Sequence, residues 1–296
     1  MSDAPTITAI APWFGGKRTL APRIVKELGD HTYYAEGCFG GLSVVLAKPV
    51  CGHEYVCDLH GDVVNLARVV ASDDMAPRLF ERLTRTALCE PMLADADALI
   101  RGDDFDRDTP DLDRAYAYFV TCWGGRNGEA GLLKNERGRT VAMRWGANGG
   151  GPGVRFKNAI DSIPAWWERL RAVTIMRRDW FDFCPKIKDE KGAAIYVDPP
   201  YLSKSDKYLH DFESHGGGAL VADDHQRLAD EMSRFRRTRV VISYYAHPRL
   251  DELYPRKRWT HVDCPRLKNL GNQGGKASIA PEVLIINGPS YTQEKA

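Results

Sequence analysis

The sequence lacks any strong bias in charge, hydrophobicity or cysteine spacing. Its 296 residues include 41 lysines and arginines against 40 aspartates and glutamates, a formal net charge of +1. With 43% hydrophobic and 27% charged residues, the composition is that of a globular chain, which excludes a disordered or fibrous protein. No apolar run approaches the roughly 20 residues of a membrane-spanning helix. The length fits one large domain or two ordinary ones.

The sequence also lacks metal-binding and targeting motifs. Seven cysteines are scattered without a CxxC pair, which favours reduced thiols over a disulfide framework or a zinc site. The eight histidines show no ligand spacing, so we expect no metal. The opening MSDAPTITAI has neither a basic segment nor a long apolar core, so we expect no signal peptide. These features predict a cytoplasmic protein.

Charge is unevenly distributed along the chain although its total is near zero. Residues 71–115 contain twelve acidic and six basic side chains, whereas residues 123–178 contain eleven basic and four acidic ones. The basic stretch is rich in glycine and includes Trp123, Trp145 and Phe156. Cations and aromatics on a flexible segment suit a nucleic-acid backbone. They suit a solvated loop equally well, and charge alone leaves both readings open.

Short β-rich runs alternate with helical patterns, which indicates an α/β fold with a largely parallel sheet. The expected strands are 33–36, 54–57, 173–176, 194–198, 239–243 and 282–287. The expected helices between them are 18–28, 41–48, 62–71, 159–171 and 223–235. In the last helix Asp223 and Asp224 offer an N-cap, and Leu228, Met232 and Phe235 follow at helical spacing.

The stretch 72–158 interrupts this alternation. Its front half predicts helices over 75–88 and 112–123, and its back half, 124–153, is dense in glycine. A long irregular segment in a compact fold is usually either functional or disordered. We therefore expect one α/β domain made of residues 1–71 and 159–296, with an inserted region at 72–158.

The strongest chemical motif is IYVDPPYL at 195–202. An apolar strand ends in Asp198-Pro199-Pro200-Tyr201, and open α/β sheets bind ligands at the carboxyl ends of their strands. The prolines carry no amide hydrogens and stiffen the turn. The Asp198 carboxylate and the Pro199 carbonyl could accept both hydrogens of an exocyclic amino group while Tyr201 covers the base. The alternative, non-functional interpretation of this motif is a Pro-Pro turn that carries a surface tyrosine.

Two further segments suit a nucleoside site. In YYAEGCFGGLSVVLAKP followed by EYVCDLHGD, a glycine turn links a strand to a helix, and Asp58 ends the next strand, where it could accept ribose hydroxyls. The turn lacks GxGxxG, which favours S-adenosylmethionine over NAD. In APWFGGK, Trp13 and Lys17 flank a Gly-Gly bend. Each segment alone is also compatible with ordinary packing.

Taken together, PWFGGK, AEGCFGG, CDLHGD, DPPY, VVISYY and EVLIING resemble, in order and spacing, the motifs of the Dam-like (D12 class, α-group) DNA adenine-N6 methyltransferases. The resemblance spans residues 12–288. It implies a Rossmann-like, S-adenosylmethionine-dependent methyltransferase sheet with an inserted, mainly helical and loop-rich region that recognises DNA. The sequence departs from the family pattern at Gly37, where proline is usual, at Cys38, where phenylalanine is usual, and at Leu42, where a small residue is frequent.

The resemblance also assigns roles to individual residues. Residues that contact or shape the S-adenosylmethionine site are Trp13, Lys17, Glu36, Gly40, Asp58, Asp179 and Asp198. Asp198, Pro199 and Tyr201 would act on an adenine flipped out of the duplex, because its amino group is out of reach inside the stack. Double-stranded DNA is the expected partner, and the candidate contacts are Arg126, Asn127, Arg137, Arg139, Arg144 and Lys157.

Two other functions stay open at this stage. N4-cytosine methylation uses the same amino chemistry, although aspartate before PPY and the motif order favour adenine. A DNA-binding homologue without activity would share the fold, although Asp58, Asp198 and Tyr201 are all present. We expect an enzyme of a bacterium or phage, of the kind found in restriction-modification systems, with no obligate protein partner.

Overall fold

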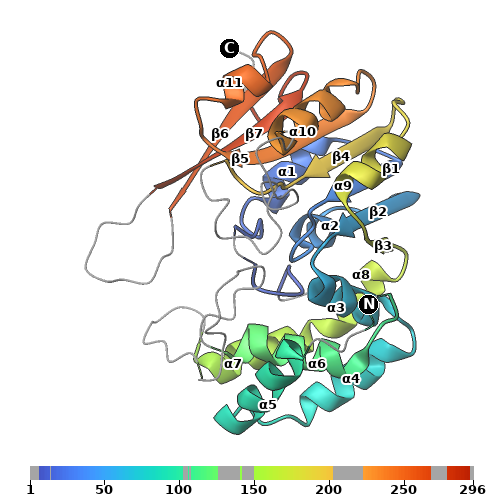
Figure 1. The fold of residues 1–296 in the computed structure, drawn as a ribbon, viewed down its shortest axis with the longest axis vertical. Helices are drawn as coiled ribbons and strands as arrows, with labels where there is room; N and C mark the ends of the chain where they lie inside the picture. The colour runs from blue at the N-terminus through green and yellow to red at the C-terminus, as the bar shows by residue number, and fades with distance from the viewer. Residues whose placement is uncertain are drawn as a thin grey trace.

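A seven-stranded mixed sheet forms the centre of the protein (Figure 1). The computed structural model describes residues 7–13, 15–102, 106, 108–125, 141, 150–202, 223–267 and 279–293. The strands are β1 (Tyr33–Gly37), β2 (His53–Asp58), β3 (Thr174–Arg177), β4 (Ala193–Val197), β5 (Arg239–Tyr245), β6 (Trp259–Leu267) and β7 (Ile279–Asn287). The six expected strands are confirmed to within three residues at each end, whereas β6 was not expected.

The strand order is β3-β2-β1-β4-β5-β7-β6. Strands β1 to β5 pair in parallel, and β7 runs antiparallel between β5 and β6. This α/β arrangement confirms the predicted Rossmann-like methyltransferase fold. The order reverses between β1 and β4, and ligands of open α/β sheets bind beyond the carboxyl ends of strands at such a reversal.

Helices cover both faces of the sheet. One face packs against α1 (Ala21–Leu28), α2 (Ser43–Ala47), α3 (Gly61–Ala71) and α8 (Ile163–Leu170). The other packs against α9 (Trp180–Phe183), the short 3-10 helix η1 (Cys184–Lys186), α10 (Asp224–Ser233) and α11 (Leu250–Leu253). The expected N-cap of α10 is confirmed, because the Asp223 side chain accepts from the amides of His225 and Gln226.

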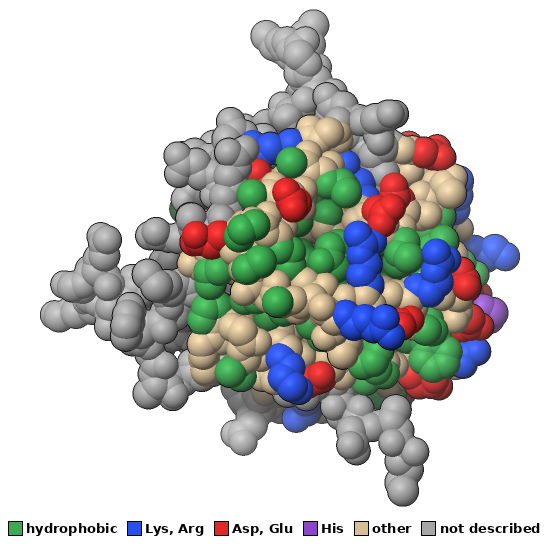
Figure 2. Space-filling view, turned by 90° about the horizontal axis from the view of Figure 1, so that it is seen from below, with side chains coloured by type: hydrophobic (Ala, Val, Ile, Leu, Met, Phe, Trp, Pro, Cys, Tyr) green, Lys and Arg blue, Asp and Glu red, His purple; other side chains and the backbone are tan. Residues whose placement is uncertain are grey.

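Four helices between α3 and α8 extend the first face into a helical layer, at the bottom of Figure 1. They are α4 (Met75–Thr84), α5 (Glu90–Arg101), α6 (Leu112–Gly124) and α7 (Pro152–Asp161). Seen from this end, cationic side chains are interspersed with carboxylates on the described surface (Figure 2). Some of the acidic side chains counted in this stretch form ion pairs with arginines four residues away, as in Arg78–Asp74 and Arg85–Glu81.

The prediction of a single helix over 159–171 is wrong. The chain instead forms α7 and α8, which meet at Ser162. Pro164 has no amide hydrogen to continue the ladder of α7, whereas it fits the first turn of a new helix. None of the helices that the structure describes has both the length and the apolar character needed to cross a membrane.

Candidate active site

The site lies where the sheet reverses its strand order. Strand β1 ends at Gly37 and β4 at Val197, and these two residues are register partners. Asp198 follows β4 directly, and its amide donates to the Gly37 carbonyl at 3.3 Å. The short apolar strand AAIYV is fully buried, so the first polar side chain after it emerges at the sheet edge. This placement makes Asp198 the centre of the site.

Three side chains hold the Asp198 carboxylate. Oδ2 accepts from Lys17 Nζ at 2.6 Å, and Oδ1 accepts from Ser243 Oγ at 2.7 Å and Tyr201 OH at 3.1 Å. Burial raises the pKa of Asp198, although the Lys17 cation and the Ser243 hydroxyl act in the opposite direction. The carboxylate is therefore oriented from both ends.

Lys17 reaches this carboxylate from the turn before α1. Gly15, at φ +73°, supplies the bend that the sequence predicts. The Nζ also donates to the Gly15 carbonyl at 2.7 Å and pairs with Glu282 Oε1 at 3.3 Å. Because its side chain is 4% exposed, Lys17 is a buried cation beside Asp198 and not a surface lysine.

Tyr201 is buried. Its hydroxyl bonds to Asp198 Oδ1 and to Glu282 Oε1, the latter at 3.0 Å. Its ring meets Tyr245 edge-on with centroids 4.4 Å apart, and Lys17 Nζ lies 5.0 Å from its centroid. The alternative interpretation, a solvent-facing tyrosine, is therefore wrong, since Tyr201 is 1% exposed.

A small pocket brings together four of the predicted site residues, Trp13, Lys17, Glu36 and Asp198. Its remaining lining residues are Gly16, Phe39, Gly41, Ser43, Val44 and Tyr196. Glu36 lies on β1 and is 1% exposed. Burial raises its pKa to about 8, against the opposing bond from Tyr34 OH to its Oε2 at 2.7 Å. The pocket thus has a cation and two carboxyl groups in a largely apolar wall.

The glycine turn after β1 is strained and supports the pocket. Cys38, Gly40 and Leu42 have φ angles of +56°, +48° and +58°, a region that side-chain-bearing residues rarely adopt. A Cβ atom on Gly40 would lie 2.7 Å from Trp13 Nε1, so glycine is needed for the indole to rest on the turn. Non-glycine strain of this kind collects at functional sites.

The two other predicted acids flank this turn. Asp58, at the end of β2, accepts from the amides of Gly40 at 2.9 Å and His60 at 2.8 Å. Asp179 follows β3 and caps α9 by accepting from the Phe181 amide at 2.8 Å. Both lie close enough to Cys38 to act on its pKa, which burial raises. Cys38 is thus a poorly ionised thiol among carboxyl groups, as expected of a packing residue.

Comparison with known families agrees with this geometry. Residues 13–96 match the family model described as D12 class N6 adenine-specific DNA methyltransferase. Over this segment the chain is similar to that family, which supports a Dam-like, adenine-specific DNA methyltransferase. Five of the predicted residues, Trp13, Lys17, Glu36, Gly40 and Asp58, fall within the matched segment. Comparison with curated proteins gives no match.

The departure of the sequence from the family pattern at Gly37 has a packing explanation. A Cβ atom on Gly37 would lie 2.4 Å from Cε3 of Trp180. Trp180 is 3% exposed and packs directly against the backbone at the end of β1. A bulkier residue at position 37 therefore has no room while Trp180 is present.

Two residues of the candidate site escaped sequence reasoning. Ser243 and Glu282 contact Asp198 or its partners, yet they come from β5 and β7. The available signal was an acid and a hydroxyl within apolar strands, in EVLIING and VVISYY. Strand pairing across the sheet was needed to connect them to Asp198.

The structure describes only one of the predicted DNA contacts. Arg126, Asn127, Arg137, Arg139 and Arg144 lie outside the described residues. Lys157 lies on α7 with its side chain 72% exposed, and it pairs with Asp161 one turn later. An exposed lysine in this place is available to solvent, and its role stays a prediction.

Proposed function

We propose that this enzyme transfers a methyl group from S-adenosylmethionine to the N6 amino group of adenine at specific sites in DNA. The observation that carries the proposal is the position of Asp198, whose oriented carboxylate lies at the strand reversal beside a pocket lined by Trp13, Lys17 and Glu36. The D12 family match supports adenine as the acceptor.

The chemistry of the pocket fits S-adenosylmethionine. Asp58 ends β2, where an acid can accept ribose hydroxyls, and the strained turn at Gly40 lets a ligand approach the backbone closely. The Asp198 carboxylate suits the cationic methionine end, and the Glu36 carboxyl can form a hydrogen bond there. Asp179 is the proposed partner of the amino group on the adenine of the cofactor. When bound, S-adenosylmethionine supplies an electrophilic methyl group.

Asp198 acts on the acceptor by hydrogen bonding. The adenine amino group is a poor nucleophile because its lone pair is delocalised into the ring. Bonds to the Asp198 carboxylate and the Pro199 carbonyl would favour a tetrahedral nitrogen and free that lone pair. The contribution is orientation by preorganised acceptors, and it needs no strong base.

Tyr201 acts on a target base that has left the duplex, since the pocket lies at a strand end inside the fold. Its ring is covered by Lys17 and Tyr245. We propose that base entry displaces one of these covers and that the ring then stacks on the adenine.

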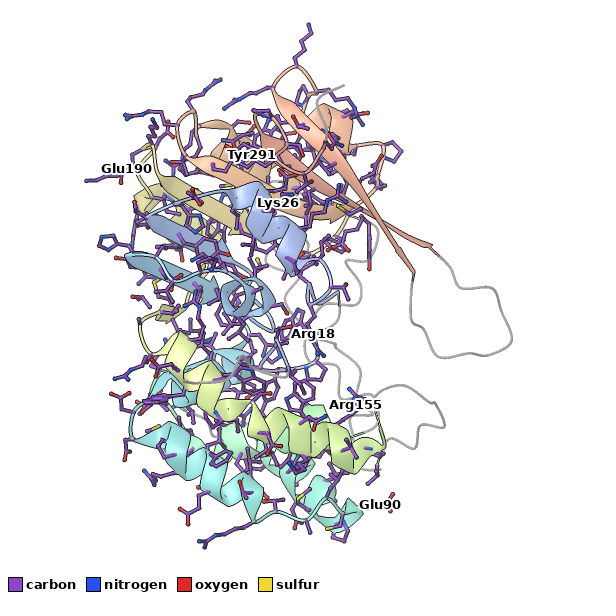
Figure 3. All side chains as sticks on the ribbon, turned by 180° about the vertical axis from the view of Figure 1, so that it is seen from behind. Arg18, Lys26, Glu90, Arg155, Glu190 and Tyr291 are labelled. Atoms are coloured by element: carbon purple, nitrogen blue, oxygen red, sulfur yellow. The ribbon has the colours of Figure 1, made fainter. Side chains whose placement is uncertain are left out.

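The DNA lies against the inserted region 72–158 in this proposal. Lys157 contacts a phosphate, and the candidates between 126 and 144 supply further contacts. Arg18 lies between the strand layer and α7, and Arg155 lies on α7 (Figure 3). Cations on this side of the molecule suit a phosphate backbone that leads to the pocket. Such an enzyme works on bacterial or phage DNA in the cytoplasm, as restriction-modification methyltransferases do.

The deciding experiment incubates the protein with labelled S-adenosylmethionine and unmethylated genomic DNA and digests the DNA to nucleosides. Label in N6-methyladenosine is expected, and label in N4-methylcytosine would change the acceptor base. Asp198→Ala should abolish transfer while its thermal unfolding stays close to that of the wild type. Turnover by that variant at the wild-type rate would refute the assignment, and cofactor binding without any labelled base would favour an inactive homologue.

A further inference from the structure

Four polar side chains lie on one face of the sheet at the edge where its parallel strands end. Side chains two positions apart on a strand share a face. Tyr34, Tyr196, Val241 and Leu284 all belong to the core on the α1 side of the sheet. Glu36, Asp198, Ser243 and Glu282 lie two residues from them and therefore face the same side. All four take part in the site already described, but Glu282 has been given no role.

Glu282 opens the part of β7 that pairs with β5, opposite Tyr245. Its side chain is 0% exposed. Its Oε1 accepts from Tyr201 OH at 3.0 Å and pairs with Lys17 Nζ at 3.3 Å. An ionised carboxyl buried to this extent is costly unless it is paired and hydrogen-bonded. The site therefore retains a second acid at a cost that packing alone does not explain.

Both of these partners of Glu282 also bind Asp198. Lys17 has three N–H donors, and its Nζ contacts the Gly15 carbonyl and both carboxyl groups. The Tyr201 hydroxyl has one proton and lies between an oxygen of each acid. Glu282 thus reaches Asp198 through two bridging groups, a cation and a phenol.

We propose that Glu282 is a positioning residue for methyl transfer, which shares Lys17 and Tyr201 with Asp198 and so keeps the Asp198 carboxylate oriented and able to accept bonds from the target amino group. This inference rests on the proposed function. Without Glu282, Lys17 and the Tyr201 proton would turn fully to Asp198. A carboxylate neutralised in this way is a weaker acceptor for the substrate.

Glu282 also sets the charge around Asp198. The titratable groups that act on Asp198 or are acted on by it come from several elements: Lys17, Glu36, Cys38, Asp58, Tyr196, Tyr244 and Glu282. The charge of Glu282 raises the pKa of Asp198. Its removal lowers that pKa, so the acid limb of the pH–rate profile moves to lower pH.

The test compares Glu282→Gln, which keeps an acceptor oxygen but no charge, with Glu282→Ala. We expect kcat to fall about tenfold in Glu282→Gln and up to about 100-fold in Glu282→Ala, the range for losing hydrogen bonds to charged groups. Equilibrium dialysis should show the S-adenosylmethionine Kd changing much less than kcat. Asp263→Asn, which removes an exposed acid on neighbouring β6, is the matched control and should keep the wild-type profile.

A double-mutant cycle with Tyr201→Phe separates positioning from general destabilisation. If Glu282 acts through Tyr201, the two losses in kcat are not additive, and the acid limb shifts in Glu282→Gln at unchanged unfolding temperature. Additive losses in kcat, or a Glu282→Gln variant with wild-type kcat and acid limb, would overturn this inference and leave the proposed function standing. A wild-type protein that labels no base would overturn the proposed function, and this inference with it.

Discussion

At the scale of single residues, the site depends on conformations and ionisation states that the surrounding fold imposes. The turn that carries Gly40 holds Cys38 and Leu42 at positive φ, a strain of about 1–3 kcal/mol each. These are two of the positions at which the sequence departs from the family pattern. The third, Gly37, is constrained by Trp180. The departure at Gly37 thus has a local physical cause.

Gly37→Ala should destabilise the protein by about 1–3 kcal/mol, the usual cost of overpacking, because the new methyl group collides with the Trp180 ring. Chemical denaturation measures this change in the free energy of unfolding. Adding Trp180→Phe should recover part of the loss, since a smaller ring leaves room. Equal losses with and without Trp180→Phe would contradict the packing explanation.

Glu36→Gln should change stability in a pH-dependent way. Because burial raises the folded-state pKa of Glu36 to about 8, the protonated form is favoured in the fold. The contribution of the raised pKa to the free energy of unfolding is fully present below the unfolded pKa of about 4.3 and is lost as pH rises through 8. Glutamine mimics the protonated acid. As pH rises from 5.5 to 9, the free energy of unfolding of the variant should therefore increase by at least about 1 kcal/mol relative to that of the wild type. A difference in unfolding free energy that stays constant with pH would contradict this.

At the scale of elements, a buried ionic cluster joins three pieces of secondary structure on the face that carries the site. Lys48 follows α2, Glu54 lies on β2 and Arg169 lies on α8. Two guanidinium nitrogens of Arg169 donate to the Glu54 carboxylate at 2.7 and 2.8 Å, and Lys48 pairs with the same carboxylate. Lys48 Nζ also lies 4.7 Å from the centroid of the Tyr34 ring, whose hydroxyl holds Glu36.

Glu54→Ala should cost about 3–5 kcal/mol, because it leaves two buried cations without their carboxylate. Exposed pairs are worth far less, so removing Asp74, which pairs with Arg78 at the surface, is the control and should cost under about 1 kcal/mol. Urea unfolding of both variants checks the contrast. Similar costs for the two would show that the cluster gives no special stability.

The elements differ in how well the sequence predicts them. Strands β1, β2, β4 and β5 are short runs rich in β-forming residues and bounded by turns, so local pattern suffices. Strand β6, with the sequence WTHVDCPRL, mixes polar residues and a proline, and only its nine register pairs with β7 make it a strand. Helix α5, EPMLADADALIR, has weak periodicity and gains its order by packing on α6.

At the scale of the whole molecule, the end of the described chain is tied back to its beginning. Lys26 of α1 and Tyr291 lie near each other in Figure 3. The buried Glu27 carboxylate accepts from the amides of Tyr291 at 2.8 Å and Thr292 at 3.1 Å and from the Ser290 hydroxyl. Arg239 of β5 completes the cluster. Helix α1 follows Lys17, so this closure also supports the active-site turn.

Glu27→Ala should release the 290–292 segment and lower the free energy of unfolding by about 2 kcal/mol or more, since several bonds to a charged group are lost. Burial raises the pKa of Glu27, but bonds from Ser290, Thr292 and Tyr291 outweigh it, and the net pKa lies below the ordinary value. The stability gained is present above the unfolded pKa and is lost as pH falls. The wild type should therefore lose its advantage over Glu27→Ala in acid, which unfolding at pH 7 and pH 3 measures.

The sequence by itself determined the α/β class, the positions of strands β1 to β5 along the chain and the motifs that carry Trp13, Lys17, Glu36 and Asp198, because these depend on local periodicity and on short runs of residues. Only the tertiary structure joined Asp198 to Ser243 and Glu282, buried the Tyr201 ring and placed Trp180 against Gly37. Such contacts depend on strand pairing and side-chain packing between residues far apart in the chain. No local pattern encodes that geometry.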